Sequence, residues 1–328
     1  MIFIFFNFIF SLILFYCLVL KFPIKLFYKQ PDQRGFHYTP ISQIGGLLIF
    51  IVIFINFFFI SIINSELNLN FLFLLIIFPL FCICIIDDIR EINISIRIIF
   101  QLLTISVLLL FYNGHLLIDN IYYLTITLFI IIYLVSFLNF FNFMDGINGY
   151  VSSNFLFIII FYSYLFNPLN YLDNYLLITI IPIIVFLYFN FILKKVFLGD
   201  SGSILLAFIL IVFYLDMYEK SFLNIYQIIL INSLYFIDAI STFLIKLIKK
   251  ENIFHPHKTH IYQLLNAKYN YYLVNFFQLL NNIVILAINY LLIKFTNLNF
   301  LIVIIFFLFV MFVIVYKYKK LILVDSKI

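Results

Sequence analysis

The stretch CICIIDDIREINISIR, residues 82–97, closes one long apolar run and opens the next, with a short charged connection between them. Residues 69–86 contain no charged side chain, and a helix needs about 20 apolar residues to cross the bilayer core. Asp87 and Asp88 follow directly, side by side, at the expected membrane edge. The stretch predicts the end of a transmembrane helix, and it raises the question of what two adjacent carboxylates hold there.

The composition of the whole chain is that of a membrane protein. Of its 328 residues, 66% are hydrophobic and 10% are charged, which is too little polar surface for a soluble globule of this size. Apolar segments of spanning length occur eleven times, at 2–20, 41–63, 69–86, 95–112, 121–138, 150–167, 175–191, 203–217, 222–245, 273–293 and 299–316. We therefore expect an all-α, polytopic membrane protein with about eleven transmembrane helices, in a single domain over residues 1–328.

The basic residues predict the orientation in the membrane. Of the 19 Lys and Arg residues, all except Lys220 and Lys294 fall on connections after odd-numbered spans or in the C-terminal tail. Cytoplasmic connections carry such an excess of Lys and Arg, so we expect the N-terminus outside and the C-terminus in the cytoplasm. The net charge of +5 is then a topology signal and an attraction to anionic lipid, not a sign of nucleic-acid binding.

Unusual polar stretches all fall on the expected cytoplasmic side. They are DDIRE (87–91), NFFNFMDGING (139–149), NFILKKVFLGDSGS (190–203) and HPHKTHIYQ (255–263). Four stretches on one face of a membrane predict one composite site that opens to the cytoplasm.

Asp87 and Asp88 have two interpretations. They can mark a helix end that reaches water, or they can act as a base or hold Mg²⁺, which prefers carboxylate oxygens and shares its other positions with water and phosphate. Arg90 and Arg97 lie close enough in the sequence to help neutralise a phosphate, although a topology signal alone would also place them there.

Asn139, Asn142 and Asp145 recur every three residues, so on a helix they share about a third of the circumference. Such a polar face is either a hydrogen-bonded seam between helices or part of a binding site. Gly146 and Gly149 favour binding, because two of only eight glycines lie here and a tight backbone lets a ligand approach closely.

FLGDSGS, residues 197–203, comes directly before a new apolar run. Backbone amides at a helix N-terminus, with the hydroxyls of Ser201 and Ser203, can cradle a phosphate. Asp200 beside such a cradle is best interpreted as a metal ligand, since an unneutralised carboxylate would repel the anion. Helix capping by Asp or Ser is the alternative.

The stretch HPHKTHIYQ contains His255, His257 and His260. A zinc site is disfavoured, because no cysteine and no acid except Glu251 lies nearby to complete four ligands. His257 and His260, spaced by three with Lys258 between them, are better interpreted as donors to a phosphate or a sugar. Asp238 lies well inside the predicted span 222–245, where an ionisable residue is either functional or hydrogen-bonded to a neighbouring helix.

Taken together and in this order, the motifs resemble those of the polyprenyl-phosphate N-acetylhexosamine-1-phosphate transferases, the bacterial membrane enzymes that start lipid-linked envelope polysaccharides. The resemblance covers nearly the whole chain, through PDQRGFHYTP and GG (31–46), DDIREINISIRIIFQ (87–101), NFFNFMDGING (139–149), FNFILKKVFLGDSGS (189–203), DAISTFLIKLIKK (238–250) and HPHKTHIYQ (255–263). The ending HKTHIYQ is most similar to that of the O-antigen and exopolysaccharide initiators.

The resemblance implies a reaction and a location. A sugar-1-phosphate passes from a UDP-amino sugar to a polyprenyl phosphate of the undecaprenyl type, which gives a polyprenyl diphosphate-sugar and UMP. The enzyme is then a phosphotransferase for substituted phosphate groups that requires Mg²⁺, with Mn²⁺ as a substitute. It is expected in the bacterial inner membrane, with the active site on the cytoplasmic face.

The resemblance also implies residue roles. Asp87 and Asp88 match the essential aspartate pair, and Asp200 matches the magnesium ligand. The positions expected to bind substrate are Asn139, Asn142, Asp145, Asn148, Asn190, His257 and His260.

Some positions depart from the family pattern. Asn148 stands where many members have a second Asp, and Gln43 and Ile44 replace an arginine and a glycine. These changes bear on substrate identity more than on the reaction type. A transporter or flippase of an anionic lipid or metabolite is the alternative function, although such proteins place their binding groups near the bilayer midplane. The identity of the amino sugar and the formation of a homodimer stay open.

Overall fold

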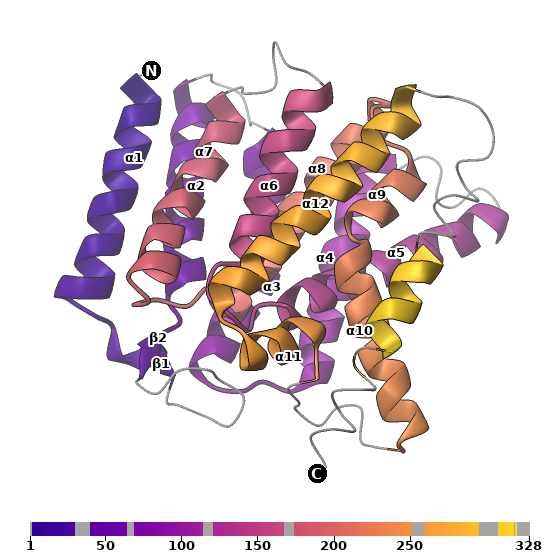
Figure 1. Cartoon of the computed structure of the whole chain (residues 1–328). Coiled ribbons are helices and arrows are strands. Elements are labelled where there is room, and N and C mark those ends of the chain that lie inside the picture. The colour runs from indigo at the N-terminus through magenta and orange to yellow at the C-terminus, as the bar shows by residue number, and fades with distance from the viewer. Residues whose placement is uncertain are drawn as a thin grey trace. The chain divides into compact units, whose positions relative to one another are not determined.

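The computed structural model of the chain describes residues 2–29, 40–63, 69–113, 121–166, 174–250, 259–294, 308–317 and 319. Most of these residues are helical, and the strands among them form one short antiparallel hairpin of β1 (Tyr28–Lys29) and β2 (Ile41–Ser42) (Figure 1). The expected all-α, polytopic membrane protein is confirmed. By contacts, the described residues up to Leu215 form one compact unit, and those from Asp216 onward form a second. The single domain expected over 1–328 stays a prediction.

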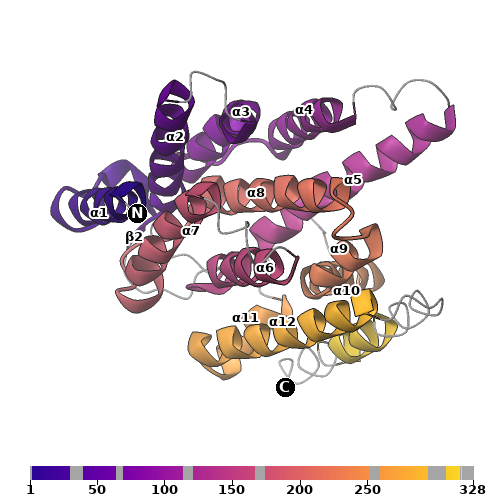
Figure 2. The ribbon, with the colours of Figure 1, turned by 90° about the horizontal axis from the view of Figure 1, so that it is seen from above.

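The first unit contains most of the helices. In chain order they are α1 (Ile2–Phe15), which continues as a π-helix (η1, Tyr16–Lys21), a 3₁₀ turn (η2, Lys25–Phe27), α2 (Gly45–Ile63), α3 (Leu69–Ile89), α4 (Ile94–Asn113), α5 (Ile121–Phe143), α6 (Tyr150–Phe166), α7 (Asn174–Leu187), which continues as a π-helix (η3, Tyr188–Ile192), and α8 (Gly199–Glu219), which runs on into the second unit. Seen from above, α1, α2 and α7 lie side by side, and α3, α4 and α5 follow one another (Figure 2).

Seven helices among the described residues are long and apolar enough to cross a membrane. They cover Ile4–Lys21, Gly45–Ile63, Phe71–Ile89, Ile94–Tyr112, Leu124–Phe143, Gly199–Glu219 and Tyr271–Leu292. Three shorter apolar helices, Tyr150–Leu165, Leu176–Ile192 and Leu308–Lys317, fall within or overlap other expected spans. Helices therefore form where the hydropathy predicted them, while the count of eleven and the orientation of the termini stay predictions.

The second unit contains α9 (Ile225–Ile231), α10 (Ser233–Ile248), α11 (Ile261–Lys268) and α12 (Tyr271–Lys294), with α12 packed against α9 and α11. The sequence predicted one span over 222–245, and in the structure this segment is divided into α9 and α10, which meet at an angle of 70°. The bend lies at Asn232, whose side-chain amide donates to the carbonyl oxygen of Ile228 at 2.8 Å. Asn side chains that bond to the backbone in this way compete with the regular helix.

The start of α8 is held by close backbone packing in the first unit. The chain before α8 bonds to the hairpin and to the start of α2, because the amide of Phe197 donates to the carbonyl of Ser42 at 2.7 Å and the amide of Gly46 donates to the carbonyl of Leu198 at 2.8 Å. A Cβ atom on Gly46 would lie 2.2 Å from the backbone nitrogen of Gly202, so only glycine lets α2 and α8 approach this closely. Farther along, Ile204–Phe208 are buried on every side, as expected for a helix that is apolar all round.

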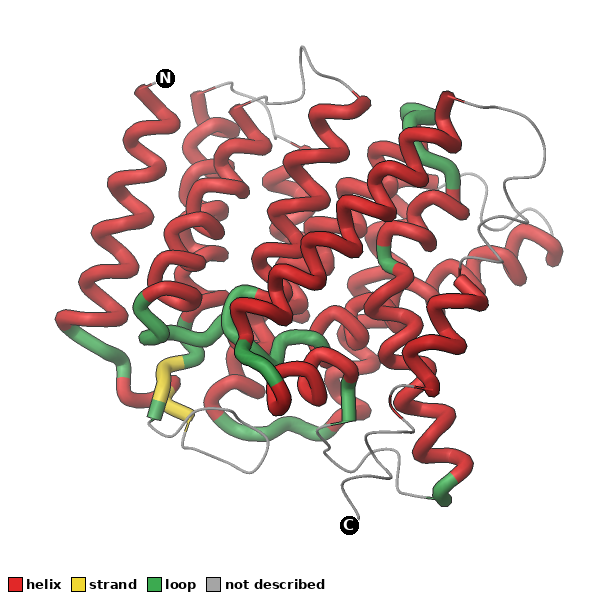
Figure 3. The backbone as a smooth tube through the Cα atoms, in the orientation of Figure 1, coloured by secondary structure: helices red, strands yellow, loops and turns green. Residues whose placement is uncertain are grey.

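The loops of the first unit that carry the polar motifs gather at one end. The connections after α3, α5 and η3 lie at the same end of this unit as the hairpin (Figure 3). Their polar side chains are therefore close enough to form a shared site.

Candidate active site

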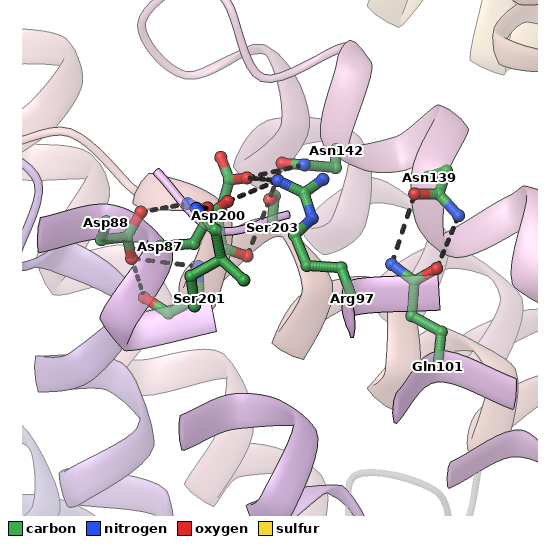
Figure 4. A network of polar contacts seen from close by, with 10 residues as sticks. Asp87, Asp88, Arg97, Gln101, Asn139, Asn142, Asp200, Ser201 and Ser203 are labelled. Atoms are coloured by element: carbon green, nitrogen blue, oxygen red, sulfur yellow. Dashed lines mark hydrogen bonds and ion pairs between the residues drawn. The ribbon is translucent and has the colours of Figure 1, made fainter. Parts of the chain in front are cut away.

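Side chains from α3, α4, α5 and α8 of the first unit meet at this end (Figure 4). Asp87 and Asp88 come from the last turn of α3, Arg97 from the first turn of α4, Asn142 from the last turn of α5, and Asp200 from the first turn of α8. The sequence predicted that these stretches form one composite site, and the structure brings their side chains into direct contact.

Asp88 binds the N-terminus of α8. Its Oδ1 accepts a hydrogen bond from the backbone amide of Asp200 at 2.6 Å, and its Oδ2 accepts from the amide and the hydroxyl of Ser201 at 3.1 and 2.5 Å. The first amides of a helix lack partners within the helix and carry partial positive charge, so a carboxylate is a favourable cap. The sequence predicted a phosphate cradle at these donors, but Asp88 occupies them instead.

Gly199 makes this cap possible. Its φ is +77°, which L side chains rarely adopt, and a Cβ atom there would lie 2.8 Å from both oxygens of Asp88. The glycine before the aspartate in GDSGS is therefore required by the backbone and by the carboxylate packed against it.

Arg97 connects two carboxylates. Its Nη1 forms an ion pair with Oδ2 of Asp200 at 2.8 Å and a second, shorter one with Oδ2 of Asp87, whose Oδ1 accepts from the amide of Ile92 at 2.7 Å. The Asp87 side chain is 9% exposed and that of Asp200 is 34% exposed. Asp200 is therefore the more accessible of the two carboxylates that share this cation.

Asn142 links α5 to the same aspartate. Its Nδ2 donates to Oδ2 of Asp200 at 3.1 Å, and its Oδ1 accepts from the hydroxyl of Ser203 at 2.6 Å. Because Asp200 lies between Arg97 and Asn142, its carboxylate oxygen faces donors from two other helices. Asn142, predicted from the sequence, thus lies in the cluster.

Asn139, one turn earlier on α5, pairs with Gln101 of α4 (Figure 4). Asn139 Nδ2 donates to Gln101 Oε1 at 2.7 Å and to the carbonyl of Val135 at 2.8 Å, while Gln101 Nε2 donates to Asn139 Oδ1 at 3.3 Å. This is the hydrogen-bonded helix seam that the spacing allowed as an alternative to binding.

Asn190 is buried and joins two loops. Its Oδ1 accepts from the amide of Gly149 at 2.7 Å, and its Nδ2 donates to the carbonyl of Val196 at 2.7 Å. Gly149 has a φ of +79°, so a glycine is needed where this contact is made. Asn190 thereby joins the connections that contain Gly149 and Val196, and its predicted substrate contact stays a prediction.

Asp145 and Asn148 lie half-buried in the loop between α5 and α6. The pKa of Asp145 is raised to about 8, first by burial and then by the negative charges of Asp200 and Asp88, while Lys29 lowers it. An acid that holds its proton near neutral pH is a group whose charge can change when a cation or a phosphate arrives.

His260 belongs to the second unit, at the start of α11, and His257 lies outside the described residues. Asp238 of α10 caps α11, because its carboxylate accepts from the amide of Ile261 at 2.9 and 3.1 Å. His260 Nδ1 lies 3.5 Å from Oδ1 of Asp238, and Lys319 forms an ion pair with the same oxygen. Asp238 thus has a structural role in this unit.

The first unit's cluster has the donor chemistry of a magnesium site. Asp87 and Asp200 direct carboxylate oxygens at one positive nitrogen, and Mg²⁺ takes such oxygens from one or two carboxylates together with water and phosphate oxygens. Within the described ranges no group of three His, Cys, Asp or Glu side chains is arranged to hold a metal ion alone. The residues therefore fit Mg²⁺ or Mn²⁺ that completes its coordination with substrate and water.

The sequence did not single out Gln101, and it indicated Arg97 only as a phosphate neighbour or a topology signal, not as a partner of the aspartates. Arg97, Gln101 and Thr104 follow the i, i+4, i+7 spacing of one helix face, and Gln101 and Thr104 are buried within an otherwise apolar helix. A polar face inside a transmembrane helix is the signal that could have identified them.

Two comparisons with known proteins bear on this site. Residues 70–218 match the family model described as glycosyl transferase family 4. The undecaprenyl-phosphate alpha-N-acetylglucosaminyl 1-phosphate transferase of Thermotoga maritima is 27% identical over 243 residues, which cover 74% of each chain. The resemblance to the polyprenyl-phosphate N-acetylhexosamine-1-phosphate transferases is confirmed. The segment matched by the family model contains the whole cluster from Asp87 to Ser203.

The histidine stretch lies beyond the segment that matches the glycosyl transferase family 4 model, which ends at residue 218. Its role is therefore inferred from the motif, whereas the Asp87–Asp200 cluster has both the motif and the geometry.

Proposed function

We propose that the protein transfers an N-acetylhexosamine-1-phosphate from a UDP-sugar to undecaprenyl phosphate, giving undecaprenyl diphosphate-sugar and UMP. The observation that carries the proposal is the cluster in which Asp87 and Asp200 share the cationic Nη1 of Arg97 at the polar end of apolar helices. A reaction between a lipid phosphate and a water-soluble diphosphate needs charged groups at the edge of a membrane. The Thermotoga maritima relative, whose name contains undecaprenyl phosphate and N-acetylglucosaminyl 1-phosphate, supports the acceptor and the transferred group.

The chemistry is a single displacement at the β-phosphorus. An oxygen of the lipid phosphate attacks the β-phosphorus and forms a bond to it. The bond between the β-phosphorus and the oxygen that bridges it to the α-phosphate breaks, and UMP leaves with the electron pair. A phosphate monoester loses its second proton with a pKa of about 6, so the nucleophile is already charged at neutral pH. The protein's main task is to position the two phosphates and to offset their charge.

Asp200 is the residue we expect to hold Mg²⁺, with Asp87 as the neighbouring carboxylate. The bound ion supplies Lewis-acid neutralisation of the diphosphate. Asp87, which shares a cation with Asp200, is the better candidate of the aspartate pair to orient the attacking phosphate. Asp88, whose oxygens accept three donors from Asp200 and Ser201, acts as a positioning residue for α8.

Asn142 is the substrate-binding candidate that the cluster supports most directly, because it contacts Asp200. Asp145 and Asn148, on the loop that follows, are proposed to face the nucleotide. For Asn139 and Asn190 the hydrogen bonds favour positioning roles. His257 and His260 are proposed, from the motif, to bind phosphate or sugar.

The cellular setting is part of the same proposal. The distribution of Lys and Arg supports a cytoplasmic active site in a bacterial inner membrane. The histidine motif favours initiation of O-antigen or exopolysaccharide synthesis, and the amino sugar is expected to be N-acetylated.

The test compares wild type with Asp200→Asn and a matched control, Asp216→Asn, in nanodiscs that contain undecaprenyl phosphate and Mg²⁺. Asp216 lies on the same helix, has a 35% exposed side chain like that of Asp200, and pairs with Lys220 at 2.9 Å. UMP release from UDP-GlcNAc and UDP-GalNAc is measured. We expect release by wild type and Asp216→Asn and a loss of at least about 100-fold in Asp200→Asn.

Absence of UMP release from either donor in wild type, together with movement of labelled lipid or nucleotide across the membrane, would support the transporter alternative instead. Equal release by all three proteins would show that Asp200 holds no ion the reaction needs.

A further inference from the structure

Arg97 contacts two of the three carboxylates of the cluster, those of Asp87 and Asp200, through one nitrogen. Its Nη1 lies against Oδ2 of Asp87 and at 2.8 Å from Oδ2 of Asp200 (Figure 4). The oxygens that we expect to face a metal ion therefore face a side-chain cation. The guanidinium is fixed at this one corner, and its Nη2 and Nε carry three further N–H groups that can bind another acceptor.

We propose that Arg97 is a placeholder cation: it neutralises Asp87 and Asp200 before the metal ion binds, competes with that ion, and turns to the phosphate of the lipid acceptor once the ion takes its place. The inference rests on the proposed function and adds a residue role to it.

Charge balance gives the first argument. Asp87, Asp88 and Asp200 bring three carboxyl groups together, and Arg97 is the guanidinium among them. A half-buried cluster of like charges is unfavourable without a cation. Arg97 therefore stabilises the metal-free protein, and a divalent ion can replace it without leaving the carboxylates unpaired.

Competition follows from the shared atom. Mg²⁺ binds a carboxylate oxygen at 2.0–2.1 Å, and a guanidinium hydrogen-bonded to that same oxygen would lie close to the ion. Two positive charges at such a separation repel each other strongly in a partly buried site. Binding of the ion at Asp200 Oδ2 thus competes with Nη1, and withdrawal of Nη1 relieves the repulsion.

The released guanidinium suits a phosphate. Its planar fork binds two phosphate oxygens at once, which an ammonium group cannot do. Arg97 lies in the first turn of α4 and its side chain is 18% exposed, so its guanidinium is partly accessible to an incoming phosphate. A purely structural ion pair, by contrast, would stay in place when metal and phosphate bind.

The experiment measures Mn²⁺ binding by electron paramagnetic resonance, with the full chain in nanodiscs and without nucleotide. The variants are Arg97→Gln, Arg97→Lys and the control Arg90→Gln, which removes an equal charge from an exposed residue just after α3. We expect Arg97→Gln to bind Mn²⁺ about tenfold more tightly than wild type, because the competing charge is gone. Arg90→Gln and Arg97→Lys should stay within about twofold of wild type.

A second measurement covers the case in which Arg97→Gln folds poorly. Its thermal midpoint should be lower than that of wild type without metal and should rise more than that of wild type on addition of Mn²⁺. Binding of undecaprenyl phosphate in the presence of Mn²⁺ should be about tenfold weaker in Arg97→Gln than in Arg90→Gln.

Equal or weaker Mn²⁺ binding in Arg97→Gln, relative to Arg90→Gln, would overturn the placeholder role. Unchanged binding of undecaprenyl phosphate would overturn the transfer of Arg97 to the phosphate. The two proposals can fail separately. If wild type releases no UMP but Arg97→Gln binds Mn²⁺ more tightly than Arg90→Gln, the proposed reaction is refuted and the placeholder role is not. If wild type releases UMP but the variants bind Mn²⁺ equally, the placeholder role is refuted and the proposed reaction is not.

Discussion

The amide pair between Gln101 and Asn139 should be a measurable link between α4 and α5. Gln101 is fully buried, donates to Asn139 Oδ1 at 3.3 Å and accepts from Asn139 Nδ2 at 2.7 Å. In Gln101→Leu, Nδ2 of Asn139 keeps its bond to the carbonyl of Val135, but Oδ1 loses this donor. Gln101→Leu therefore removes two side-chain hydrogen bonds between α4 and α5, and it leaves Oδ1 of Asn139 without the donor from Gln101.

The magnitude follows from the number of bonds. A buried polar group that loses its partner costs about 1–3 kcal/mol, whereas hydrogen bonds between membrane helices average about 0.6 kcal/mol and reach about 1.7 kcal/mol. For two bonds, of which one is long at 3.3 Å, we expect Gln101→Leu to lower the free energy of unfolding by about 1–2 kcal/mol.

The assay is a double-mutant cycle of Gln101→Leu and Asn139→Leu, with the free energy of unfolding measured in mixed micelles. We expect a coupling energy of at least about 0.5 kcal/mol, because the two residues are in contact. Ser136→Ala is the control on the same helix: its hydroxyl bonds to the carbonyl of Ile132 in its own helix, at 2.7 Å, and its effect should stay within about 0.5 kcal/mol.

Activity gives the second readout. Gln101 lies one turn after Arg97, and Asn139 lies one turn before Asn142, so the pair sets the approach of both residues to Asp200. We expect UMP release by Gln101→Leu to fall about tenfold. A coupling energy below about 0.3 kcal/mol with unchanged activity would refute the link, and Asn139 would then return to the substrate-binding role that the motif implied.

Three further substitutions test other parts of the structure. Because Asp145 has its pKa raised to about 8 from an ordinary value of 3.8, the folded protein keeps a proton that the unfolded chain has lost, and its stability should fall as pH rises from about 4 to 8. The thermal midpoint of Asp145→Asn should therefore increase relative to that of wild type as pH rises over this range. A constant difference between the two midpoints would exclude the raised pKa of Asp145. Lys319→Met should destabilise the second unit by about 3–5 kcal/mol, since it leaves the buried Asp238 without its lysine, and adding Asp238→Asn should restore most of the loss in urea unfolding. Gly199→Ala should cost at least about 1–2 kcal/mol in the same assay, because of its positive φ and the closeness of Asp88, and a neutral effect would show that the start of α8 can rearrange.

Hydropathy was sufficient to predict most of the helices, because a membrane span is specified by the composition of one segment. The end of α3 at Ile89 and the start of α8 at Gly199 lie close to the predicted span ends at 86 and 203, since charge and glycine interrupt the apolar runs there. The bend at Asn232 was not predicted, because 222–245 satisfies the apolar pattern on either side of it. Whether an Asn turns its amide to its own backbone depends on the packing around it, which periodicity does not describe.

The sequence predicted which residues lie in the candidate site better than it predicted which of them bind to each other. The motifs correctly placed Asp87, Asn142 and Asp200 in one cluster. The partner of Asp88 could not be predicted, since its bonds to Asp200 and Ser201 cross more than a hundred positions of sequence and depend on how α3 packs beside α8. A helix N-terminus attracts an anion, but the sequence does not say whether that anion is a ligand or a carboxylate of the protein.

In the structure the anion at the N-terminus of α8 is a carboxylate of the protein, and the two adjacent aspartates therefore have different roles. Asp88 binds the amide of Asp200 and so fixes the backbone from which the Asp200 side chain extends. Asp87 points to Arg97 and shares that cation with the Asp200 side chain. One aspartate thus positions Asp200 through its main chain, and the other balances charge with its carboxylate. Because neighbouring residues on a helix point about 100° apart, an adjacent pair at the end of α3 can do both, which a single aspartate could not.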